Sequence, residues 1–585
     1  MAMASVSQPV VQTVRRSGGN VGHAISAALI CPFFAVFLVW PIWEVVRVGF
    51  EQNGHPSAVY IRLIISDPQL MRGLFNAAAV AVTVMFSSLA LALPLAVISV
   101  RFKFPGRDWL SPMLLAPLVL PPFVGAIGVR LLLGRFGPLT MLLGLGGGAG
   151  FDWIGRYRML GIIVVEALHL YPVMLLNLQA SLANIDPGLE QAAANLGAGR
   201  WRVFRKITLP LLRPGLFAGC TLTLIWSFTE LGTPLIFDFN TITPVQIFWQ
   251  ITQVAANPLP YALVVMMLAG AGVLYLLGKV VLGGGAEASA SKGIAGGDAA
   301  RRLRGLPAFA ATIFFVVVLI LALLPHAAVI LTSFSATGQW YRSVLPRQFT
   351  LNHYTAALLD DLAIPSVRNS VFYASSATIL GVAVGLAAAV VIVRSRLRIR
   401  GFIDVLSMLP LAVPGLVLAF GYLAIGIMLK QKHPGLPNWL DVQERPALFL
   451  ILAYAVRRLP YIVRAAAAGL QQTPRDLELA AENLGASHAK TLRKITFPLI
   501  AGNLIAGALL AFAFALLEVS DSLILAQKAA YFPITRAILE LAQRMGDGLY
   551  IASALGVWAM LLLTLCLLAA GSMVGKRWGS VLNAE

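Results

Sequence analysis

The segment LEQAAANLGAGRWRVFRKITLPL (189–211) recurs as LELAAENLGASHAKTLRKITFPL (477–499), 288 residues further along the chain. Fourteen of the 23 positions are identical. Self-similarity at a fixed spacing marks an internal repeat, in which each copy is one structural unit of the same kind. We therefore expect two related halves that place these segments at equivalent positions.

The repeat continues upstream of these segments, where the offset is 293 residues instead of 288. The difference makes the second half five residues shorter in the intervening loop. The duplication therefore covers neighbouring parts of each half as well as the segment itself. The matching pairs at the larger offset include Asn76 and Asn369, Arg101 and Arg394, Pro117 and Pro410, and Pro121 and Pro414.

The 585 residues are 58% hydrophobic and only 12% charged. An ordinary soluble domain carries about 25% charged residues, and a disordered chain has low hydrophobicity, so both classes are excluded. The three cysteines (Cys31, Cys220 and Cys566) lie far apart in apolar runs, which suggests buried thiols rather than a disulfide framework or a zinc site. The composition indicates a chain that folds in a lipid bilayer.

Stretches of about 20 apolar residues are long enough to cross the hydrocarbon core of a bilayer as helices. Six such stretches occur in each half, so we expect an all-α membrane protein with about 12 transmembrane helices. An even number of spans per half means that the halves are parallel repeats rather than inverted ones. The expected spans are 24–47, 75–100, 109–134, 161–182, 214–236 and 259–282, then 306–332, 368–394, 402–429, 446–469, 502–525 and 549–574.

These spans divide the chain into two six-helix domains, at residues 24–282 and 306–574. Between them, residues 283–305 are rich in Gly, Ala and Ser and are expected to form a flexible linker. An N-terminal arm (1–23) and a tail (575–585) flank the domains. Arg15 and Arg16 precede the first span, and no small-residue cleavage site follows it, so we expect a retained anchor rather than a removed signal peptide.

Lysine and arginine are distributed unevenly between the two sides of the predicted membrane. If the N-terminus is cytoplasmic, the inside segments hold 25 of the 44 basic residues and the outside loops hold 13. Cytoplasmic loops of membrane proteins carry the excess of positive charge. We therefore expect both termini, the linker and both repeated segments in the cytoplasm. This asymmetry explains the net charge of +19, and nucleic-acid binding is not expected.

Each repeated segment reads as a short helical hairpin between the fourth and fifth spans of its half. Gly197 and Gly485 end the first helix, because glycine tolerates a left-handed backbone, and a basic second helix follows. A narrow apolar stripe suits docking into a groove of a partner protein, whereas the alternative is a hairpin that lies on lipid headgroups. The stripe consists of Leu189, Ala192, Ala193 and Leu196 in one copy and Leu477, Ala480, Ala481 and Leu484 in the other.

The copies QAAANLG followed by ITLP (191–210) and LAAENLG followed by ITFP (479–498) resemble the EAA motif of ABC importer permeases. The resemblance covers nearly the whole chain, as two fused copies of a type I permease. It implies a coupling helix in each half that docks in a cleft of an ATP-binding subunit. Gln191 and Leu479 stand where the motif usually has Glu, with Glu190 and Glu478 one residue earlier. The implied coupling residues are Glu190, Gln191, Ala192, Ala193, Gly197, Pro210, Glu478, Leu479, Ala480, Ala481, Gly485 and Pro498.

The resemblance also implies a function and partners. Permeases of this family form the solute pathway of ATP-driven importers in the bacterial inner membrane, together with two copies of a cytoplasmic ABC ATPase and an extracytoplasmic solute-binding protein. ATP and Mg²⁺ bind to the ATPase, so no cofactor is expected in this chain. Fusion of both halves is similar to the ferric-ion, thiamine and 2-aminoethylphosphonate branches. Ferric ion is the leading substrate, and thiamine, phosphonate, sugar phosphate and polyamine remain open.

The sequence lacks the residue patterns of an enzyme. There is no G-x-x-x-x-G-K-[ST] phosphate loop, and GSMVGK at 571–576 has the wrong spacing. There is no G-x-S-x-G nucleophile elbow, and the seven histidines are scattered without metal-ligand spacing. We therefore expect no catalytic residue and no metal site, and we expect ATP hydrolysis in a separate chain.

Ionisable residues inside spans are costly and usually face protein or a wet cavity. Glu230 and Glu518 occupy equivalent positions, about 24 Å along the fifth span of each half. They are either a pair of acids that lines the outer pathway or its gate, or partners in helix-end hydrogen bonds to neighbouring spans.

The fourth span of each half contains a second group of ionisable residues. Glu166 and His169 lie in the first half, and Arg457, the counterpart of His169, is followed by Arg458 in the second. Acid in one half and base in the other permit an ion pair across the pseudo-twofold axis. Such a pair would be a gate or a structural clamp, and the clamp is favoured.

Six plus six spans with a central cytoplasmic linker also describe secondary carriers of the major facilitator type. Such a carrier would place its signature between the second and third spans, whereas the duplicated segment here follows the fourth. A membrane scaffold that transports nothing would have no use for paired intramembrane acids. The permease interpretation therefore leads.

Overall fold

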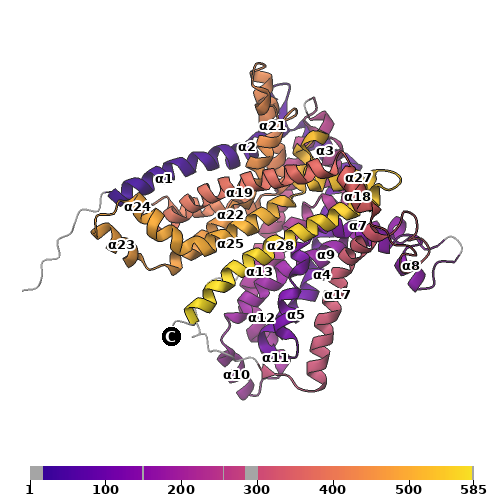
Figure 1. Cartoon of the computed structure of the whole chain (residues 1–585), viewed down its shortest axis with the longest axis horizontal. Coiled ribbons are helices and arrows are strands. Elements are labelled where there is room, and N and C mark those ends of the chain that lie inside the picture. The colour runs from indigo at the N-terminus through magenta and orange to yellow at the C-terminus, as the bar shows by residue number, and fades with distance from the viewer. Residues whose placement is uncertain (1–17, 148–149, 255, 284–300, 583–585) are drawn as a thin grey trace, which may run out of the picture.

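The computed structural model describes residues 18–147, 150–254, 256–283 and 301–582, and it shows a membrane protein that is almost entirely helical (Figure 1). Within these residues, nine helices are long and apolar enough to cross a membrane, or up to 11 if each of two bent helix pairs is one span. Most of the predicted N-terminal arm and linker lies outside the described residues.

The first half starts with one span, His23–Gly49, that is built from three consecutive helices. These are α1 (Gly18–Phe34), the π-helical η1 (Ala35–Val39) and α2 (Trp40–Gly49). The remaining helices of this half are α3 (Val59–Ser66), α4 (Pro68–Arg101), α5 (Arg107–Met113), α6 (Ala116–Val119), α7 (Pro122–Leu132), α8 (Pro138–Leu142), α9 (Trp153–Ala183), α10 (Pro187–Asn195), α11 (Arg200–Val203), η2 (Phe204–Thr208), α12 (Leu209–Leu211), α13 (Arg213–Phe228), α14 (Gly232–Ile236), α15 (Thr243–Trp249), η3 (Ile251–Gln253) and α16 (Leu259–Leu282).

The second half repeats this order with fewer short helices. Its helices are α17 (Leu306–Phe334), α18 (Asn352–Leu359), α19 (Ala363–Arg394), α20 (Arg400–Ala412), α21 (Gly415–Lys432), η5 (Asn438–Leu440), α22 (Ala447–Gln472), α23 (Arg475–Asn483), α24 (His488–Thr491), η6 (Leu492–Thr496), α25 (Phe497–Leu516), α26 (Ser520–Leu525), η7 (Ala529–Tyr531), α27 (Ile534–Gln543) and α28 (Gly548–Leu582). The strands are minimal: β1 (Glu51–Gln52) pairs antiparallel with β2 (His55–Pro56), and β3 (Phe102–Lys103) pairs parallel with β4 (Arg301–Arg302).

Two predicted spans are broken rather than continuous. In the predicted span 109–134 the two helical pieces, Arg107–Leu118 and Pro122–Leu132, are bent by 93°. The predicted span 402–429 divides at Pro414 into α20 and α21. Pro121 and Pro414 have nearly the same backbone angles, with φ of −62° and −57° and ψ of 127° and 138°. Proline has no backbone N–H to donate to the carbonyl four residues earlier, and its ring clashes with that carbonyl. Prolines at equivalent positions therefore break equivalent spans.

The fifth span of each half also ends earlier than predicted. The sequence predicts spans at 214–236 and 502–525, whereas α13 ends at Phe228 and α25 ends at Leu516. A short non-helical link follows each helix, and then the short helix α14 or α26 begins. Glu230 and Glu518 lie in these links, between two helices, and not within one continuous span as predicted.

The tenth predicted span, 446–469, is present as the continuous helix α22. It is not one of the nine apolar helices within the described residues, because Arg457, Arg458 and Arg464 interrupt its apolar run. Most of its apolar residues are buried, since α22 packs against α19 and α25. The helix is therefore enclosed by protein, which makes internal arginines tolerable.

The first span of each half packs against the opposite half. Helices α1 and α2 contact α19 and α21, whereas α17 contacts α5 and α7. Equivalent glycines, Gly128 and Gly421, allow the close approach: a Cβ on Gly128 would overlap the carbonyl oxygen of Pro325, and one on Gly421 would overlap that of Pro41. The Tyr422 hydroxyl also donates to the Phe37 carbonyl at 2.5 Å. The two halves are therefore interlocked.

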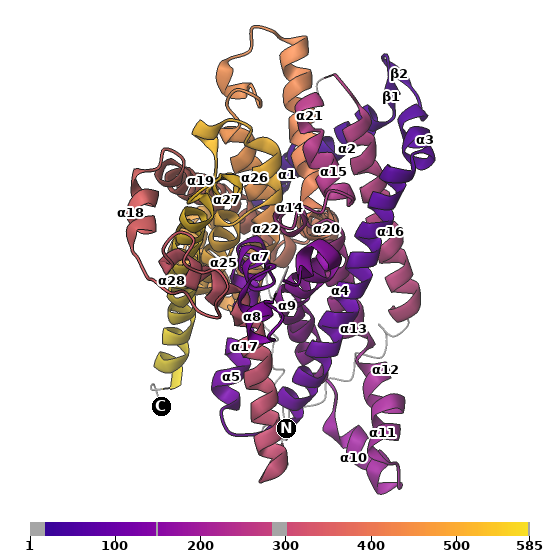
Figure 2. The ribbon, with the colours of Figure 1, turned by 90° about the vertical axis from the view of Figure 1, so that its right-hand side faces the viewer.

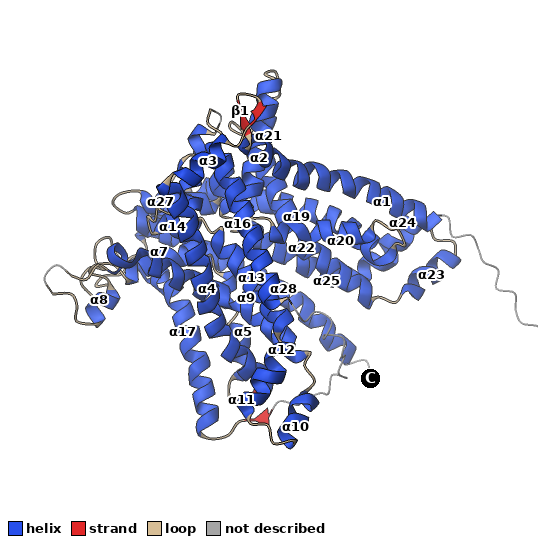
Figure 3. Cartoon of the chain, turned by 180° about the vertical axis from the view of Figure 1, so that it is seen from behind, coloured by secondary structure: helices blue, strands red, loops and turns tan. Residues whose placement is uncertain are grey.

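The repeated hairpins lie at the tips of two diverging arms. Figure 1 shows α23 and α24 at the end of one arm and α10 and α11 at the end of the other, and Figure 3 shows the same arrangement from behind. Figure 2 shows α10 and α11 at the end of their arm from a third direction. The arms meet away from these tips, where one hydrophobic core includes residues of both halves such as Phe123 and Phe420. We call the hairpin-bearing side the hairpin side and the opposite side the far side.

Candidate functional site

The residues that the sequence predicts to be functional lie in two places within the described chain: the duplicated hairpins and a cavity between the halves. In each hairpin the first helix ends in the same hydrogen-bonded turn. Gly197 N–H donates to Ala194 O and Ala198 N–H to Ala193 O, both at 3.0 Å, and the residues 288 positions later make the same two bonds at the same lengths. Gly197 and Gly485 have φ of 84° and 85°. This left-handed turn is the Schellman arrangement, as expected from the glycines.

The hairpin tips expose a leucine in each copy. Leu196 and Leu484 are each 89% exposed, although leucine is an apolar side chain. Gln191, Ala192 and Ala480 are also exposed, whereas Ala481 is buried. The predicted apolar stripe therefore presents its leucine end to the surroundings and turns part of its alanines toward the protein.

Glu190 and Glu478 point into the protein instead of toward the surroundings. Their carboxylates form ion pairs with Arg101 and Arg394, with nitrogen–oxygen distances of 2.8 and 3.2 Å. The resemblance to the EAA motif implies that these glutamates belong to the segment that docks on the ATP-binding subunit. Their carboxylates are thus already bound within the chain.

The second hairpin helix differs between the halves. Pro210 and Pro498 both lie just after a π-helical turn, η2 or η6. In the first half the helix bends by 67° between Leu211 and Arg213, whereas in the second Leu492–Leu516 forms one span. Pro214 follows the bend and has Gly502 as its counterpart, so the missing N–H of a proline accounts for the difference.

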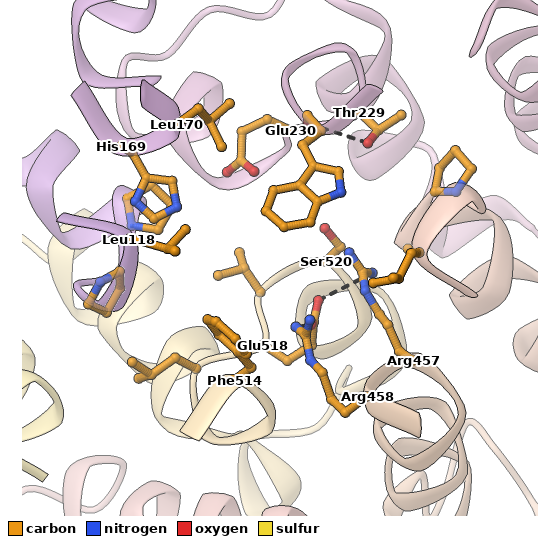
Figure 4. A pocket seen from close by; sticks show the side chains of 18 of the residues that line it. Leu118, His169, Leu170, Thr229, Glu230, Arg457, Arg458, Phe514, Glu518 and Ser520 are labelled. Atoms are coloured by element: carbon orange, nitrogen blue, oxygen red, sulfur yellow. Dashed lines mark hydrogen bonds and ion pairs between the residues drawn. The ribbon is translucent and has the colours of Figure 1, made fainter. Parts of the chain in front are cut away.

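The second feature is a cavity of about 170 Å³ between the halves. All four breaks in the spans reach it, because Pro121, Pro414, Glu230 and Glu518 are among its lining residues. Figure 4 shows Glu230 on one side of the cavity and Glu518 with both arginines on the other. The structure thus brings together every ionisable residue predicted for the pathway: Glu166, His169, Glu230, Arg457, Arg458 and Glu518.

The second half contributes a compact group of charges to this cavity. Arg457 Nη1 lies 3.3 Å from Glu518 Oε1 and 3.7 Å from Asp521 Oδ1. Arg458 pairs with the other oxygen of Glu518 and lies over the Phe514 ring, 5.6 Å from its centroid. The predicted ion pair between the halves is therefore wrong, since both arginines find their acids within their own half. Buried charges need close partners, and here the two arginines of α22 and Glu518 supply them to one another.

Arg457 reaches Glu518 only because of a glycine. A Cβ on Gly415, the first residue of α21, would overlap the guanidinium of Arg457. The proline break at Pro414 and the glycine after it therefore make room for the charged group. Asp521, which is fully buried, and Gly415 are site residues that the sequence reasoning missed. Asp521 was detectable as an acid in a predicted span, whereas the role of Gly415 needed the fold.

The first half contributes acids without a paired base. Glu230 Oε1 accepts hydrogen bonds from the N–H groups of Gly232 and Thr233 at 3.1 and 3.3 Å. Glu166 is buried, accepts from the Ser227 hydroxyl through Oε2, and has no hydrogen-bond partner at Oε1. Within the described residues, neither carboxylate belongs to an ion pair. The cavity is thus acidic on the side of the first half.

His169, also in the first half, forms a hydrogen bond to the backbone at the break in the third span. Its Nδ1 lies 2.8 Å from the carbonyl oxygen of Pro117, which can only accept, so Nδ1 is the donor. The helical partner of that carbonyl would be the N–H of Pro121, which does not exist. His169 therefore satisfies the carbonyl that the break leaves free. The imidazole ring of His169 therefore stabilises the bent span.

Within the described residues, no group of three or more His, Cys, Asp or Glu side chains is placed so that it could hold a metal ion.

Comparisons with known proteins agree with the repeated architecture. The family model for binding-protein-dependent transport system inner membrane components matches the chain twice, at residues 88–283 and 381–578. A putative ferric transport system permease protein of Haemophilus influenzae is 28% identical over 513 residues, which are 85% of this chain and 77% of that protein. A ferric transport system permease protein of Actinobacillus pleuropneumoniae is 29% identical over 517 residues, 86% of this chain and 71% of that protein. A molybdenum transport system permease protein of Escherichia coli is 35% identical over 181 residues, 30% of this chain and 76% of that protein.

Proposed function

This chain belongs to the family of binding-protein-dependent transport system inner membrane components, and we propose that it forms the complete solute pathway of an ATP-driven importer of ferric ion. It is a multi-pass inner-membrane permease, and the secondary-carrier alternative is set aside. In the proposal its two fused domains bind two copies of a separate ABC ATPase and receive solute from an extracytoplasmic binding protein. The hairpin side and both termini then face the cytoplasm.

The duplicated hairpin is the observation that carries this proposal. Leu196 and Leu484 are large apolar side chains, each 89% exposed, on turns with the same geometry. An exposed apolar anchor at a rigid turn suits insertion into a groove of a partner. Two such anchors at the tips of two arms suit one ATPase copy per arm. Closure of the ATPase pair would bring the arms together, which is the movement that alternating access requires.

Replacing both anchors with a charge tests the docking. We expect Leu196→Asp with Leu484→Asp to abolish co-purification of the ATPase with the detergent-solubilised permease, because an aspartate cannot be buried in an apolar groove without a large desolvation cost. Leu142→Asp is the matched control, since Leu142 is 68% exposed on α8, away from the hairpins. Retention of the ATPase by the double variant would contradict the docking.

The charges of the cavity support a cation as the solute. Glu518 is neutralised by Arg457 and Arg458, whereas Glu166 and Glu230 have no ion-pair partner within the described residues. Carboxylates without a counter-charge are costly away from water, and a passing cation supplies that charge. An oxyanion would instead meet two acids. This argument favours a cation over an anionic solute, and ferric ion is the cation named for two of the relatives.

Uptake by the reconstituted complex tests the cation pathway. With binding protein, ATPase and permease in proteoliposomes, we expect Glu166→Gln with Glu230→Gln to lower the rate of ferric-ion uptake about tenfold, which corresponds to about 1.4 kcal/mol. Glu444→Gln, at an exposed glutamate in a loop, is the control and should leave uptake unchanged. Unchanged uptake by the double variant would remove the two acids from the pathway, and wild-type uptake of molybdate instead of ferric ion would overturn the substrate.

A further inference from the structure

Helices α4 and α19 each run from the far side to the hairpin side without a break. Arg101 is the last residue of α4, and Arg394 is the last residue of α19. Asn76 and Asn369 lie 25 residues before these arginines, near the other end of each helix. At the helical rise per residue this interval measures about 38 Å. Both ends of both helices make polar contacts that repeat between the halves.

At the hairpin side, one glutamate joins three elements in each half. Glu190 Oε1 accepts from Arg101 Nη2 at 2.8 Å and from the Thr208 hydroxyl at 2.7 Å. The acid lies on α10, the arginine ends α4, and the threonine belongs to η2 in the second hairpin helix. The single carboxylate oxygen therefore fastens both helices of the hairpin to the end of α4.

The second half repeats this clasp with the equivalent residues. Glu478 Oε1 accepts from Arg394 Nε at 3.2 Å and from the Thr496 hydroxyl at 3.1 Å. Arg394 Nη2 also donates to the Thr473 carbonyl at 3.0 Å, in the turn that leads into α23. All the charged side chains of the two clasps are at least three-quarters buried, which weakens competition from water.

At the far side, an asparagine on each helix holds the loop beyond the cavity. The Asn76 side-chain amide donates to the Thr241 carbonyl at 2.6 Å. The Asn369 amide donates to the carbonyls of Ala530 and Phe532 at 2.9 and 3.2 Å. Thr241 lies in the loop after α14, and Ala530 and Phe532 lie in and just after η7, which follows α26. The short helices α14 and α26 begin directly after the links that hold Glu230 and Glu518.

We propose that Arg101 and Arg394 are positioning residues that couple the hairpins to the cavity through α4 and α19. The inference rests on the proposed function, in which the ATPase moves the hairpins. A hairpin that moves takes the clasped end of its helix with it. Because α4 and α19 are continuous, the displacement reaches the asparagine end and shifts the loop next to the glutamate link. In this role Glu190 and Glu478 bind Arg101 and Arg394 within the permease, and these two ion pairs connect each hairpin to its helix.

A purely structural role for the clasps makes a different prediction. If the ion pairs only hold the hairpin in shape, their loss should weaken ATPase binding, and the asparagines at the far side should have no effect on coupling. If α4 and α19 transmit movement, changes at either end should give the same defect, although about 38 Å separates them. The two roles therefore differ in which readout changes.

The first experiment removes the clasps in the full complex reconstituted with ATPase and binding protein. We expect Arg101→Met with Arg394→Met to retain the ATPase on co-purification, to keep basal ATP hydrolysis, and to lower the stimulation of hydrolysis by loaded binding protein about tenfold, a usual size for coupling between sites. Reversing both pairs, with Arg101→Glu, Glu190→Arg, Arg394→Glu and Glu478→Arg, should restore most of the stimulation. Arg396→Met, at an exposed arginine two residues after Arg394, is the control.

The second experiment removes the contacts at the other end. Asn76→Leu with Asn369→Leu keeps the side-chain size and removes the amide donors, far from any hairpin residue. We expect ATPase binding to be unchanged and stimulation to fall as in the arginine variant. Thr83→Ala, on an exposed position of α4, is the control in the same helix.

Three results would overturn the coupling role: full stimulation in the double Met variant, loss of ATPase binding together with stimulation, or full stimulation in the double Leu variant. Failure of the proposed function is separate from all three, because then the wild-type complex itself would show no ATP-dependent uptake.

Discussion

Glu230 and Glu518 occupy equivalent positions but have different electrostatic partners. Glu230 accepts from two backbone N–H groups, whereas Glu518 faces two arginines of the helix α22. The difference originates in the fourth span of each half, where His169 and Leu170 stand at the positions of Arg457 and Arg458. The glutamate of the second half, Glu518, thus forms structural ion pairs, whereas its counterpart Glu230 has no arginine partner among the described residues.

Removing the charge of each glutamate should separate these roles. Glu518→Gln leaves Arg458 without its paired carboxylate, so we expect a loss of at least about 2 kcal/mol in the free energy of unfolding. Glu230→Gln still accepts the two backbone hydrogen bonds, and we expect a loss below about 1 kcal/mol. The midpoint of thermal unfolding of the purified permease measures both. Equal shifts for the two variants would contradict the assignment of the ionic role to Glu518 alone.

The broken spans and the hairpins are the elements that distinguish this chain from a bundle of straight helices. Prolines interrupt the third span of each half, and short non-helical links that hold Glu230 and Glu518 end the helices of the fifth. The breaks converge on one cavity, because they occur at equivalent positions in parallel repeats. In the hairpins, a left-handed glycine sets the direction in which the second helix leaves the first.

The hairpin glycines should be sensitive to a single methyl group. Gly197→Ala with Gly485→Ala forces alanine into a left-handed conformation, at a cost of about 1–2 kcal/mol for each residue. We expect the affinity for the ATPase to fall about tenfold while the thermal stability of the membrane-spanning body is unchanged. Gly199→Ala is the control, since Gly199 has φ of −64° and no atom within 4 Å of an added Cβ. If Gly199→Ala lowered the affinity for the ATPase as much as the double variant does, the left-handed backbone of Gly197 and Gly485 could not be the cause.

The whole molecule is held together by exchange of first spans between the halves. Helices α1 and α2 pack on the second half, and α17 packs on the first, with Gly128 and Gly421 at the closest approach. The covalent connection between residues 283 and 301 is therefore not what keeps the halves in contact. Each half alone would expose the faces that its partner's first span covers.

Cutting the chain between residues 283 and 301 with an engineered protease site tests this arrangement. We expect the two fragments to remain together through size-exclusion chromatography in detergent, because each holds a helix that belongs to the other's packing surface. Gly128→Val with Gly421→Val should weaken the association of the cut fragments, since the added atoms overlap the carbonyls of Pro325 and Pro41. Separation of the cut wild-type fragments would contradict the interlocked arrangement.

The sequence by itself determined the membrane class, the duplication and the positions of the hairpins. Long apolar runs have no stable alternative to spanning helices, and a 23-residue repeat with the same glycine needs no tertiary information to be recognised. Residues that are equivalent in the repeat, such as Arg101 and Arg394, were also visible. Their contacts with Glu190 and Glu478 were not, because 89 and 84 residues separate the partners.

Only the tertiary structure decided which charges pair and which helices exchange places. Arg457 could have reached an acid of either half, and the outcome depended on the space that Gly415 leaves beside Pro414. The sequence analysis predicted the fifth spans too long, although Glu230 and Glu518 interrupt the apolar runs where the helices end. Hydrophobicity specifies that a segment is buried in lipid or protein, but it is non-directional and does not specify the neighbour. That choice is made by close packing and by the pairing of buried charges, which depend on the folded chain as a whole.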